Sequence, residues 1–216
     1  KIAKIEKNIS YRVYTISNGR LYTDRIHDTA AILDNKIIEG PSFQLRPGLE
    51  FPMQYSKIND NIVFEKGTPR KLKKLNGSVL SLLTGGAGNN NYWHWLYDVL
   101  PKFALCSKFL DLSKVDFFLL PNLEKNFQKE TLDALNISQH KRISSKVFRH
   151  IKAKELIITD HPVVITGNAN IDILNIPDWI VLWLKDSFLD TKKSNNNKNK
   201  IYIDREDENL NYPHKR

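Results

Sequence analysis

The stretch SVLSLLTGGAGNNNYWHWLYDVLPKF, residues 78–103, sets the fold expected for this chain. "SVLSLLT" predicts a buried strand, the run rich in glycine and asparagine predicts a turn, and "YWHWLYDVLPKF" predicts a helix. A strand that passes through a turn into a helix is the repeating unit of α/β proteins. At the carboxyl end of such a strand, the helix dipole and free backbone N–H groups favour anionic ligands.

The same alternation continues along the chain and predicts an α/β fold. Further strands are expected at 115–120 and 156–159, and helices near 92–107, 124–135 and 177–189. Strands and helices that alternate at this spacing predict a parallel sheet with helices over its faces.

The parts of the chain on either side differ in their pattern of hydrophobic and polar residues. Residues 1–70 form a β-rich segment in which Asn18-Gly19 and Asp34-Asn35 each stand between alternating runs and predict two hairpins. Residues 71–190 form the α/β domain, and residues 191–199 form a polar linker. Residues 200–216 open with "IYID", which predicts the first strand of a second domain.

Composition limits the class of protein. With 216 residues, 41% hydrophobic and 10% aromatic, the chain is expected to be globular. A single cysteine, Cys106, excludes an internal disulfide and fits a cytoplasmic setting. The net charge of +9 allows an anionic partner, and a Lys-rich composition with charges spread over a solvated surface is the alternative. We expect no nucleic acid, because the densest basic stretch, "KGTPRKLKKLNG", has no aromatic residues for base stacking.

A narrow polar stripe runs along the helix predicted at 92–107. At about 100° per residue, Asn91, His94, Asp98 and Lys102 fall within an arc of roughly 80° on an otherwise apolar helix. His94 and Asp98 are four residues apart and can touch. Pro101 is expected to bend or end the helix.

The stripe has two interpretations. A purely structural one makes His94 a core histidine satisfied by Asp98 and makes the asparagines a helix cap. The combination of a carboxylate–imidazole pair, three asparagines and a ligand-binding position favours a functional site. A nicotinamide or flavin enzyme is disfavoured, because Asn91 stands where the dinucleotide fingerprint has its third glycine.

The stretch "GGAGNNNYWHWLYDVLPKF" resembles the N-terminal signature of glycosyltransferase family 61, which includes bacterial capsular polysaccharide proteins. The signature has Gly-Gly, then Asn-Tyr-x-His-Trp-Leu, then Asp-x-Leu-Pro. The matching residues are Gly85, Gly86, Asn91, Tyr92, His94, Trp95, Leu96, Asp98, Leu100 and Pro101. "KIIEGPSFQLR", "NGSVLSLLTGG" and "KIYIDRE" look like the same family, so the resemblance extends from about Leu21 onward. In the last of these Arg205 matches and Asp204 departs from the usual Ser-Arg.

The resemblance implies a GT-B-like architecture with a Rossmann-like N-terminal domain on the acceptor side. The donor-binding domain would be cut off after its first strand, so we expect the chain to be inactive alone. The implied reaction is inverting transfer of a sugar from a nucleotide sugar to a hydroxyl of a glycan or lipid-linked glycan, in surface or capsular polysaccharide synthesis. No metal or other cofactor is implied. A cytoplasmic location follows, and a peripheral contact with the membrane stays open.

Inverting transfer needs a base for the acceptor proton and donors for the departing diphosphate. Either Asp98 is the base, or His94 is the base and Asp98 orients its ring. The expected substrate-binding residues are Gly85, Gly86, Asn89, Asn90, Asn91 and Trp93 around the cleft, and Arg205 at the diphosphate. For Arg205 a surface ion pair within "DRED" is the alternative.

Two other functions are compatible with the sequence. "IDRED" after a strand is typical of the acidic metal motif of a GT-A-type, metal-dependent glycosyltransferase, and manganese dependence would identify it. The aromatic residues around Trp93 also suit a non-catalytic carbohydrate-binding or assembly protein. Hydrolysis of the donor would argue against that second alternative.

Overall fold

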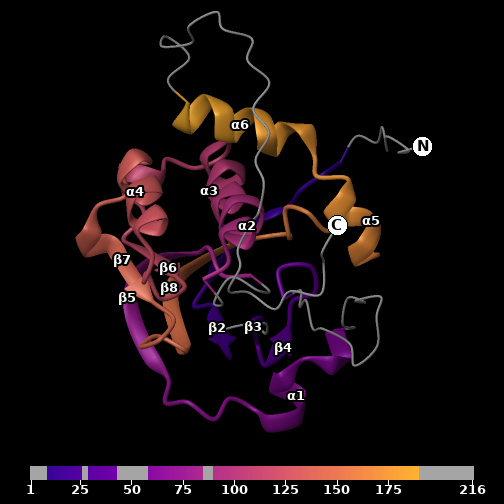
Figure 1. Ribbon diagram of the computed structural model, residues 1–216. Coiled ribbons are helices and arrows are strands. Elements are labelled where there is room, and N and C mark those ends of the chain that lie inside the picture. The colour runs from indigo at the N-terminus through magenta and orange to yellow at the C-terminus, as the bar shows by residue number, and fades with distance from the viewer. Residues whose placement is uncertain (1–8, 26–28, 43–57, 85–89, 190–216) are drawn as a thin grey trace, which may run out of the picture.

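The computed structural model describes residues 9–25, 29–42, 58–84 and 90–189, and it has a mixed α/β fold (Figure 1). The strands are β1 (Val13–Ser17), β2 (Arg20–Thr23), β3 (Thr29–Leu33), β4 (Lys36–Ile37), β5 (Lys73–Ser81), β6 (Phe117–Leu120), β7 (Arg142–Ser144) and β8 (His150–Thr159). The helices are α1 (Ile62–Lys66), α2 (Tyr92–His94), α3 (Leu100–Ser107), α4 (Asn126–Ala134), α5 (Ala169–Leu174) and α6 (Asp178–Phe188), with a π-helical turn (Trp95–Val99) joining α2 to α3. Short 3₁₀ turns lie at Ile58–Asp60, Leu112–Lys114 and Gln139–Lys141.

The strands form one sheet in the order β4-β3-β2-β8-β5-β6-β7, with β1 also paired to β8. The four strands β8, β5, β6 and β7 run parallel to one another, whereas β1 and β2 pair antiparallel with β8. The chain moves outward from β5 to β6 and β7 and then returns to the other side of β5 as β8. The strand order therefore reverses between β5 and β8.

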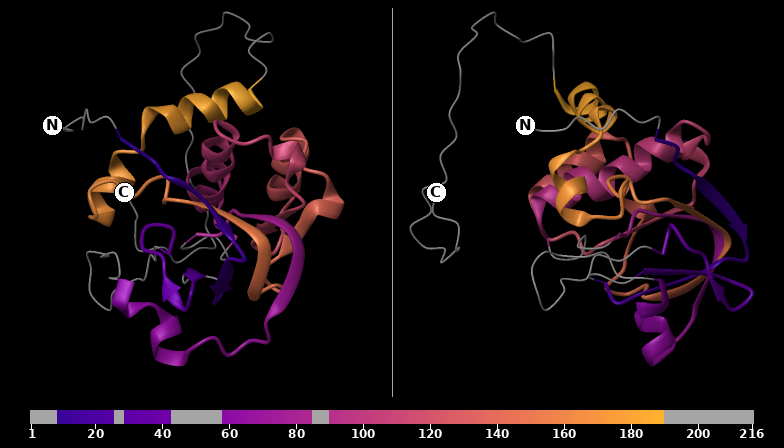
Figure 2. Two further views of the ribbon diagram at one scale, coloured as in Figure 1. Left: turned by 180° about the vertical axis from the view of Figure 1, so that it is seen from behind. Right: turned by 90° about the vertical axis from the view of Figure 1, so that its right-hand side faces the viewer.

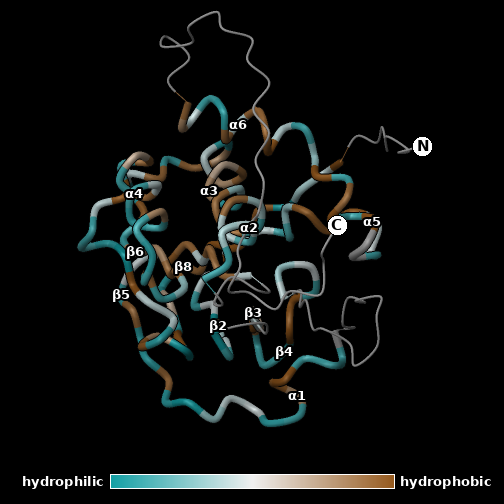
Figure 3. Tube along the Cα trace, in the orientation of Figure 1, coloured by the Kyte–Doolittle hydropathy of each residue, from teal (hydrophilic) through white to brown (hydrophobic). Residues whose placement is uncertain are grey.

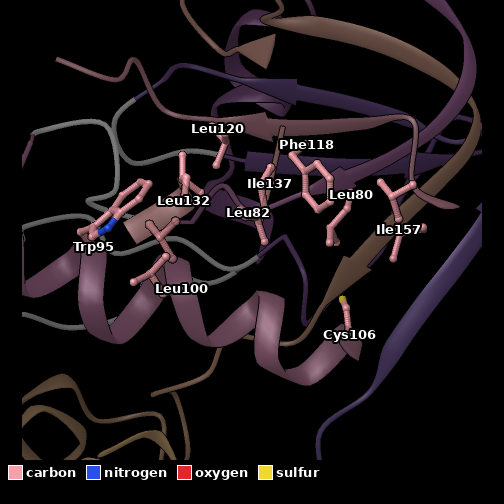
Figure 4. Close-up of a cluster of buried hydrophobic side chains, with 12 residues drawn as sticks. Leu80, Leu82, Trp95, Leu100, Cys106, Phe118, Leu120, Leu132, Ile137 and Ile157 are labelled. Atoms are coloured by element: carbon pink, nitrogen blue, oxygen red, sulfur yellow. The ribbon is translucent and has the colours of Figure 1, made fainter. Parts of the chain in front are cut away.

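The parallel strands are buried on both faces because alternate side chains enter two separate cores. Leu80 and Ile157 enter one core, whereas their neighbours Val79 and Leu156 enter the other. The first core is closed by α3, α4 and α6, which lie together over one face of the sheet (Figures 1 and 2). Figure 4 shows Trp95 and Leu100 packed against Leu82 and Leu132 in that core.

Within the described residues, the second core has a different composition. Its buried side chains come from the strands and from the second residue after β5, and no described helix contributes one: Ile16, Leu21, Ala31, Val79, Leu83, Leu119, Ile151, Ala153, Leu156 and Ile158. Hydrophobic colouring accordingly concentrates around β8 in the middle of the molecule, and the segment between α1 and β5 is largely polar (Figure 3). The helices thus cover one face of the sheet, where the sequence predicted helices over both.

The hairpin predicted at Asn18-Gly19 is wrong. β1 and β2 both run antiparallel to β8, and one register places Ser17 opposite Glu155 and Arg20 opposite Lys152. The two elements are therefore parts of a single strand with an interruption at Asn18, whose φ is 55°. Alternating polarity on both sides of Asn-Gly fits a hairpin and an interrupted strand equally well, and pairing with β8 decides between them.

The second predicted turn is confirmed. β3 and β4 pair antiparallel with Leu33 opposite Lys36, and the two residues between them have positive φ angles, 49° at Asp34 and 60° at Asn35. Two consecutive positive φ angles define the type I′ turn that suits a two-residue hairpin. The N-terminal strands thus extend the same sheet that carries β5 and β8.

The predicted strands and helices of the α/β region are present with shifted bounds. β5 and β8 begin earlier than their apolar runs, at Lys73 and His150, because the pairing of the two strands continues through polar residues such as Lys74 opposite Lys152. The helix at 92–107 does not end at Pro101, which lies in the first turn of α3, where no N–H is required. Pro177 is the residue before α6 and not part of its first turn. Among the described residues, no helix has the length and apolarity that a membrane crossing requires.

We predict that Gly19→Ala destabilises the protein by about 1–3 kcal/mol, the usual cost of overpacking a core. An added Cβ at Gly19 would lie 2.7 Å from the Cβ of Leu156, closer than such atoms approach. The matched control is Asn18→Gly, which relieves a positive φ one residue earlier and is expected to leave stability unchanged or higher. Urea unfolding measures both, and a Gly19→Ala variant as stable as the wild type would contradict the strand assignment.

Candidate functional site

The candidate site lies where the carboxyl ends of β5 and β8 meet. Residues 82–84 directly follow β5, and Asp160 and His161 directly follow β8. β5 and β8 are adjacent and parallel, so both ends open at the same edge of the sheet. This edge is also the point where the strand order reverses, the place at which open α/β sheets bind ligands.

Two of the predicted asparagines have structural contacts at the start of α2. The Asn91 side-chain oxygen accepts hydrogen bonds from the N–H groups of Trp93 (2.8 Å) and His94 (3.4 Å), so Asn91 is the helix cap. Asn90 has a φ of 60°, and its amide donates to the Glu124 carboxylate at 2.7 Å. Gly85, Gly86, Asn89 and Arg205 lie outside the described residues, so their roles stay predictions.

A π-helical turn carries Asp98 into the interior. Across Trp95–Val99 the helix widens, and the Leu100 N–H bonds to the Trp95 carbonyl five residues earlier. Pro101, one residue further, has no N–H to continue the α-helical ladder and crowds the carbonyl four residues before it. Single π turns inside α-helices occur frequently at functional sites.

His94 and Asp98 are in direct contact, as their spacing predicts. The distance from His94 Nδ1 to Asp98 Oδ2 is 2.7 Å, and the side chains are 15% and 2% exposed. The Asp98 carboxylate oxygen accepts this bond. A neutral His94 imidazole therefore carries its proton on Nδ1, and its Nε2 is left as an acceptor. Burial raises the pKa of Asp98, and the His94 hydrogen bond opposes that rise.

The second oxygen of Asp98 faces another histidine that the sequence did not identify. Asp98 Oδ1 is buried and has no hydrogen-bond partner among the described residues. His161 Nε2 lies 3.9 Å from it, and the His161 side chain is 7% exposed. His161 Nδ1 accepts the Val163 N–H at 3.2 Å, so a neutral His161 carries its proton on Nε2, the nitrogen nearest Asp98.

His161 is neutral at physiological pH. Burial lowers the pKa of its imidazole well below the ordinary value, and the positive charges of Lys102 and His94 lower it further. The signal in the sequence for His161 is its place two residues after a buried strand, because the ends of parallel strands gather at one edge. The sequence did not show that β8 pairs with β5, so the signal was not specific.

Lys102 is the fourth polar residue of the stripe, and it is buried. Its Nζ donates to the Leu83 carbonyl at 2.9 Å and thereby ties α3 to the end of β5. Burial lowers the pKa of Lys102 to about 8, against the attraction of Asp98 and Asp160. Nearby, burial raises the pKa of the Cys106 thiol to about 12, so this cysteine is not a nucleophile at neutral pH.

Trp93 lies beside the imidazole, as expected for a residue that lines the site. Its ring centroid is 5.2 Å from that of His94 with the planes at 88°, and 5.3 Å from that of Tyr97. The half-buried indole thus forms an aromatic wall next to the more exposed member of the His94–Asp98 pair.

Within the parts of the chain that the structure describes, no three His, Cys, Asp or Glu side chains gather closely enough to hold a metal ion. Comparisons of the chain with protein-family models, with curated proteins and with solved structures gave no significant match. Only the residues of the site itself therefore indicate its chemistry.

We predict that the charge of Lys102 makes stability depend on pH between about 8 and 10.5. The folded pKa is about 8 and the unfolded value 10.5, so in this window the unfolded chain binds more protons and stability rises with pH. The full rise is on the order of 3 kcal/mol. Lys102→Met removes the titration, so the stability of the wild type relative to this variant should increase from pH 8 to 10.5.

Urea unfolding of both proteins at a series of pH values measures the difference, and titrations common to the two cancel. Lys185→Met, which replaces an exposed lysine of α6, is the matched control and should show a constant difference from the wild type. A constant difference for Lys102→Met as well would mean that Lys102 titrates like a surface lysine.

Proposed function

We propose that this chain is the acceptor-side part of an inverting glycosyltransferase that moves a sugar from a nucleotide sugar to a glycan hydroxyl. The observation that carries the proposal is the 2.7 Å contact of His94 with a buried Asp98 at the carboxyl edge between β5 and β8. The resemblance of residues 85–101 to glycosyltransferase family 61 supplies the reaction class. On this proposal the parallel strands belong to the Rossmann-like first domain of a GT-B-like enzyme.

In the proposed reaction His94 is the general base, and exposure favours it over Asp98. The imidazole is 15% exposed and the carboxylate only 2%, so a hydroxyl from solvent reaches the His94 side chain more readily than Asp98. The acceptor O–H gives its proton to Nε2 while its oxygen forms the new bond to the anomeric carbon. The bond from that carbon to the diphosphate oxygen breaks, and the nucleoside diphosphate leaves with the electron pair.

Asp98 has the supporting role in this reaction. Its carboxylate holds the Nδ1–H tautomer of His94, so that Nε2 points away from the carboxylate, and it stabilises the imidazolium that forms. The proposal thus takes the second of the two assignments that the sequence allows. The departing diphosphate would be held by N–H groups of the 85–91 turn and by Arg205, which are the predicted substrate-binding elements.

Trp93 is assigned to sugar binding. An indole that borders the catalytic imidazole offers an apolar surface to the C–H groups of a sugar ring and restricts where the acceptor hydroxyl can lie. The acceptor we propose is a glycan or a lipid-linked glycan in surface or capsular polysaccharide synthesis, on the strength of the family resemblance.

We predict that Asp98→Asn lowers the turnover of the complete enzyme by roughly 10²–10⁴-fold, because the amide can neither fix the imidazole tautomer nor stabilise its cation. Asn has the same shape, so the unfolding temperature should change little. Asp186→Asn, at an exposed position on α6, is the matched control and should keep full activity. Transfer of labelled sugar to an acceptor is the measurement, and undiminished turnover in Asp98→Asn would remove Asp98 from the site.

We also predict that transfer continues in excess EDTA, since the resemblance implies that protein groups manage the leaving diphosphate. The assay compares the dialysed enzyme with and without chelator, and then with manganese restored. Activity lost with EDTA and regained with manganese would favour the metal-dependent, GT-A-type alternative built on "IDRED".

A further inference from the structure

We propose that His161 is a positioning residue that directs its Nε2–H at the second oxygen of Asp98 and so completes a His94–Asp98–His161 unit. The inference deepens the proposed function and rests on it for its catalytic consequence. The arrangement itself is argued from geometry alone.

One carboxylate oxygen of Asp98 lacks a donor in the described part of the chain. Oδ2 of Asp98 accepts the His94 N–H, whereas the buried Oδ1 has no hydrogen-bond partner among the described residues. A buried carboxylate oxygen without a donor is costly, by about 1–3 kcal/mol or more for a charged group. A donor close to Oδ1 is therefore expected to serve it.

The second step identifies that donor. Asp98 is faced by His94 and Lys102 from its own helix and by His161 from the segment after β8. His94 is used by Oδ2, and Lys102 Nζ donates to the Leu83 carbonyl. His161 Nε2, at 3.9 Å from Oδ1, comes within hydrogen-bond range after a shift of about 1 Å.

The third step fixes the orientation of His161. The Val163 N–H donates to His161 Nδ1 at 3.2 Å, so the imidazole ring is held from behind by its own turn. The proton of the neutral ring is then on Nε2, the nitrogen that lies 3.9 Å from Asp98 Oδ1. The contact joins the end of β8 to the helix that follows β5, and it keeps the carboxylate anionic and correctly placed for His94.

Two substitutions separate this role from a merely structural one. His161→Gln places an amide N–H₂ where Nε2 lies but loses the acceptor for Val163. His161→Asn keeps an acceptor at the Nδ1 position for the Val163 N–H but cannot reach Asp98. A structural role in the turn would be rescued by Asn, and a positioning role would be rescued by Gln.

The experiment follows the titration of His94 by NMR in protein with labelled histidine, with His94→Gln used to assign the signal. In the Asn variant the Asp98 anion loses a donor and becomes a stronger partner for the His94 cation, so the His94 midpoint should rise by about half a pH unit. In the Gln variant it should stay near the wild-type value. Equal shifts in the two variants, or no shift in either, would overturn the proposal.

Activity of the complete enzyme gives a second readout. His161→Asn should lower kcat by roughly 10–100-fold, the usual effect of losing a residue that orients a catalytic ligand, with KM little changed, and His161→Gln should retain most of kcat. A loss of kcat in Gln but not in Asn would also overturn the proposal. If the wild type transfers no sugar while the NMR result is as expected, the proposed function fails and the positioning role stands.

Discussion

The parallel pairing of β5 with β8 is the constraint on which the rest of the structure depends. It extends from Lys73 opposite Ile151 to Leu80 opposite Ile157, and β8 carries β1 and β2 on its other edge. Every described strand is therefore positioned by these two, either directly or through one or two intervening strands. The same pairing brings the helix that follows β5 next to the residues that follow β8. A site that uses both segments exists only because two strands separated by about half of the described chain lie side by side.

The polar groups at this junction are expensive to bury, and their arrangement offsets much of that cost. A lone buried carboxylate or ammonium would cost several kcal/mol. Here burial raises the pKa of Asp98 and lowers that of Lys102, which are the directions expected when the interior disfavours charge. The hydrogen bond from His94 opposes the rise in the pKa of Asp98. The attraction between Asp98 and Lys102 opposes the shifts of both groups. A polar stripe on a helix whose other faces are apolar breaks the ordinary pattern of a buried helix, and such exceptions are expected at functional sites.

The parts of the fold and site that local sequence determines were predictable, and those set by distant pairing were not. The helix at 92–107 and the His94–Asp98 contact follow from periodicity and from a spacing of four residues. The turn at Asp34-Asn35 follows from residues that tolerate positive φ angles. The interruption at Asn18-Gly19 looks the same locally but is decided by the register with β8. His161 is 63 residues after Asp98 in the sequence, and no local pattern indicates which strand its own strand will join. The π turn at Trp95–Val99 likewise depends on how Pro101, at the start of α3, is accommodated when the helix packs.

The polar side chains of the stripe pass from partly exposed to buried along the helix. This difference in burial explains how the charge of the site can change during the proposed reaction. His94 is the outermost and partly exposed, Asp98 follows four residues later at 2% exposure, and Lys102 lies four residues further at 3%. With neutral imidazoles, the Asp98 anion and the Lys102 cation balance, so the resting site has no net charge. Protonation of His94 then makes the site positive by one charge at its solvent side, while the carboxylate behind it keeps the new cation stable. In the proposed reaction, a site that becomes positive as it accepts a proton suits the departure of an anionic diphosphate at the same moment. The buried lysine matters to this balance because its positive charge offsets the Asp98 anion behind the imidazole.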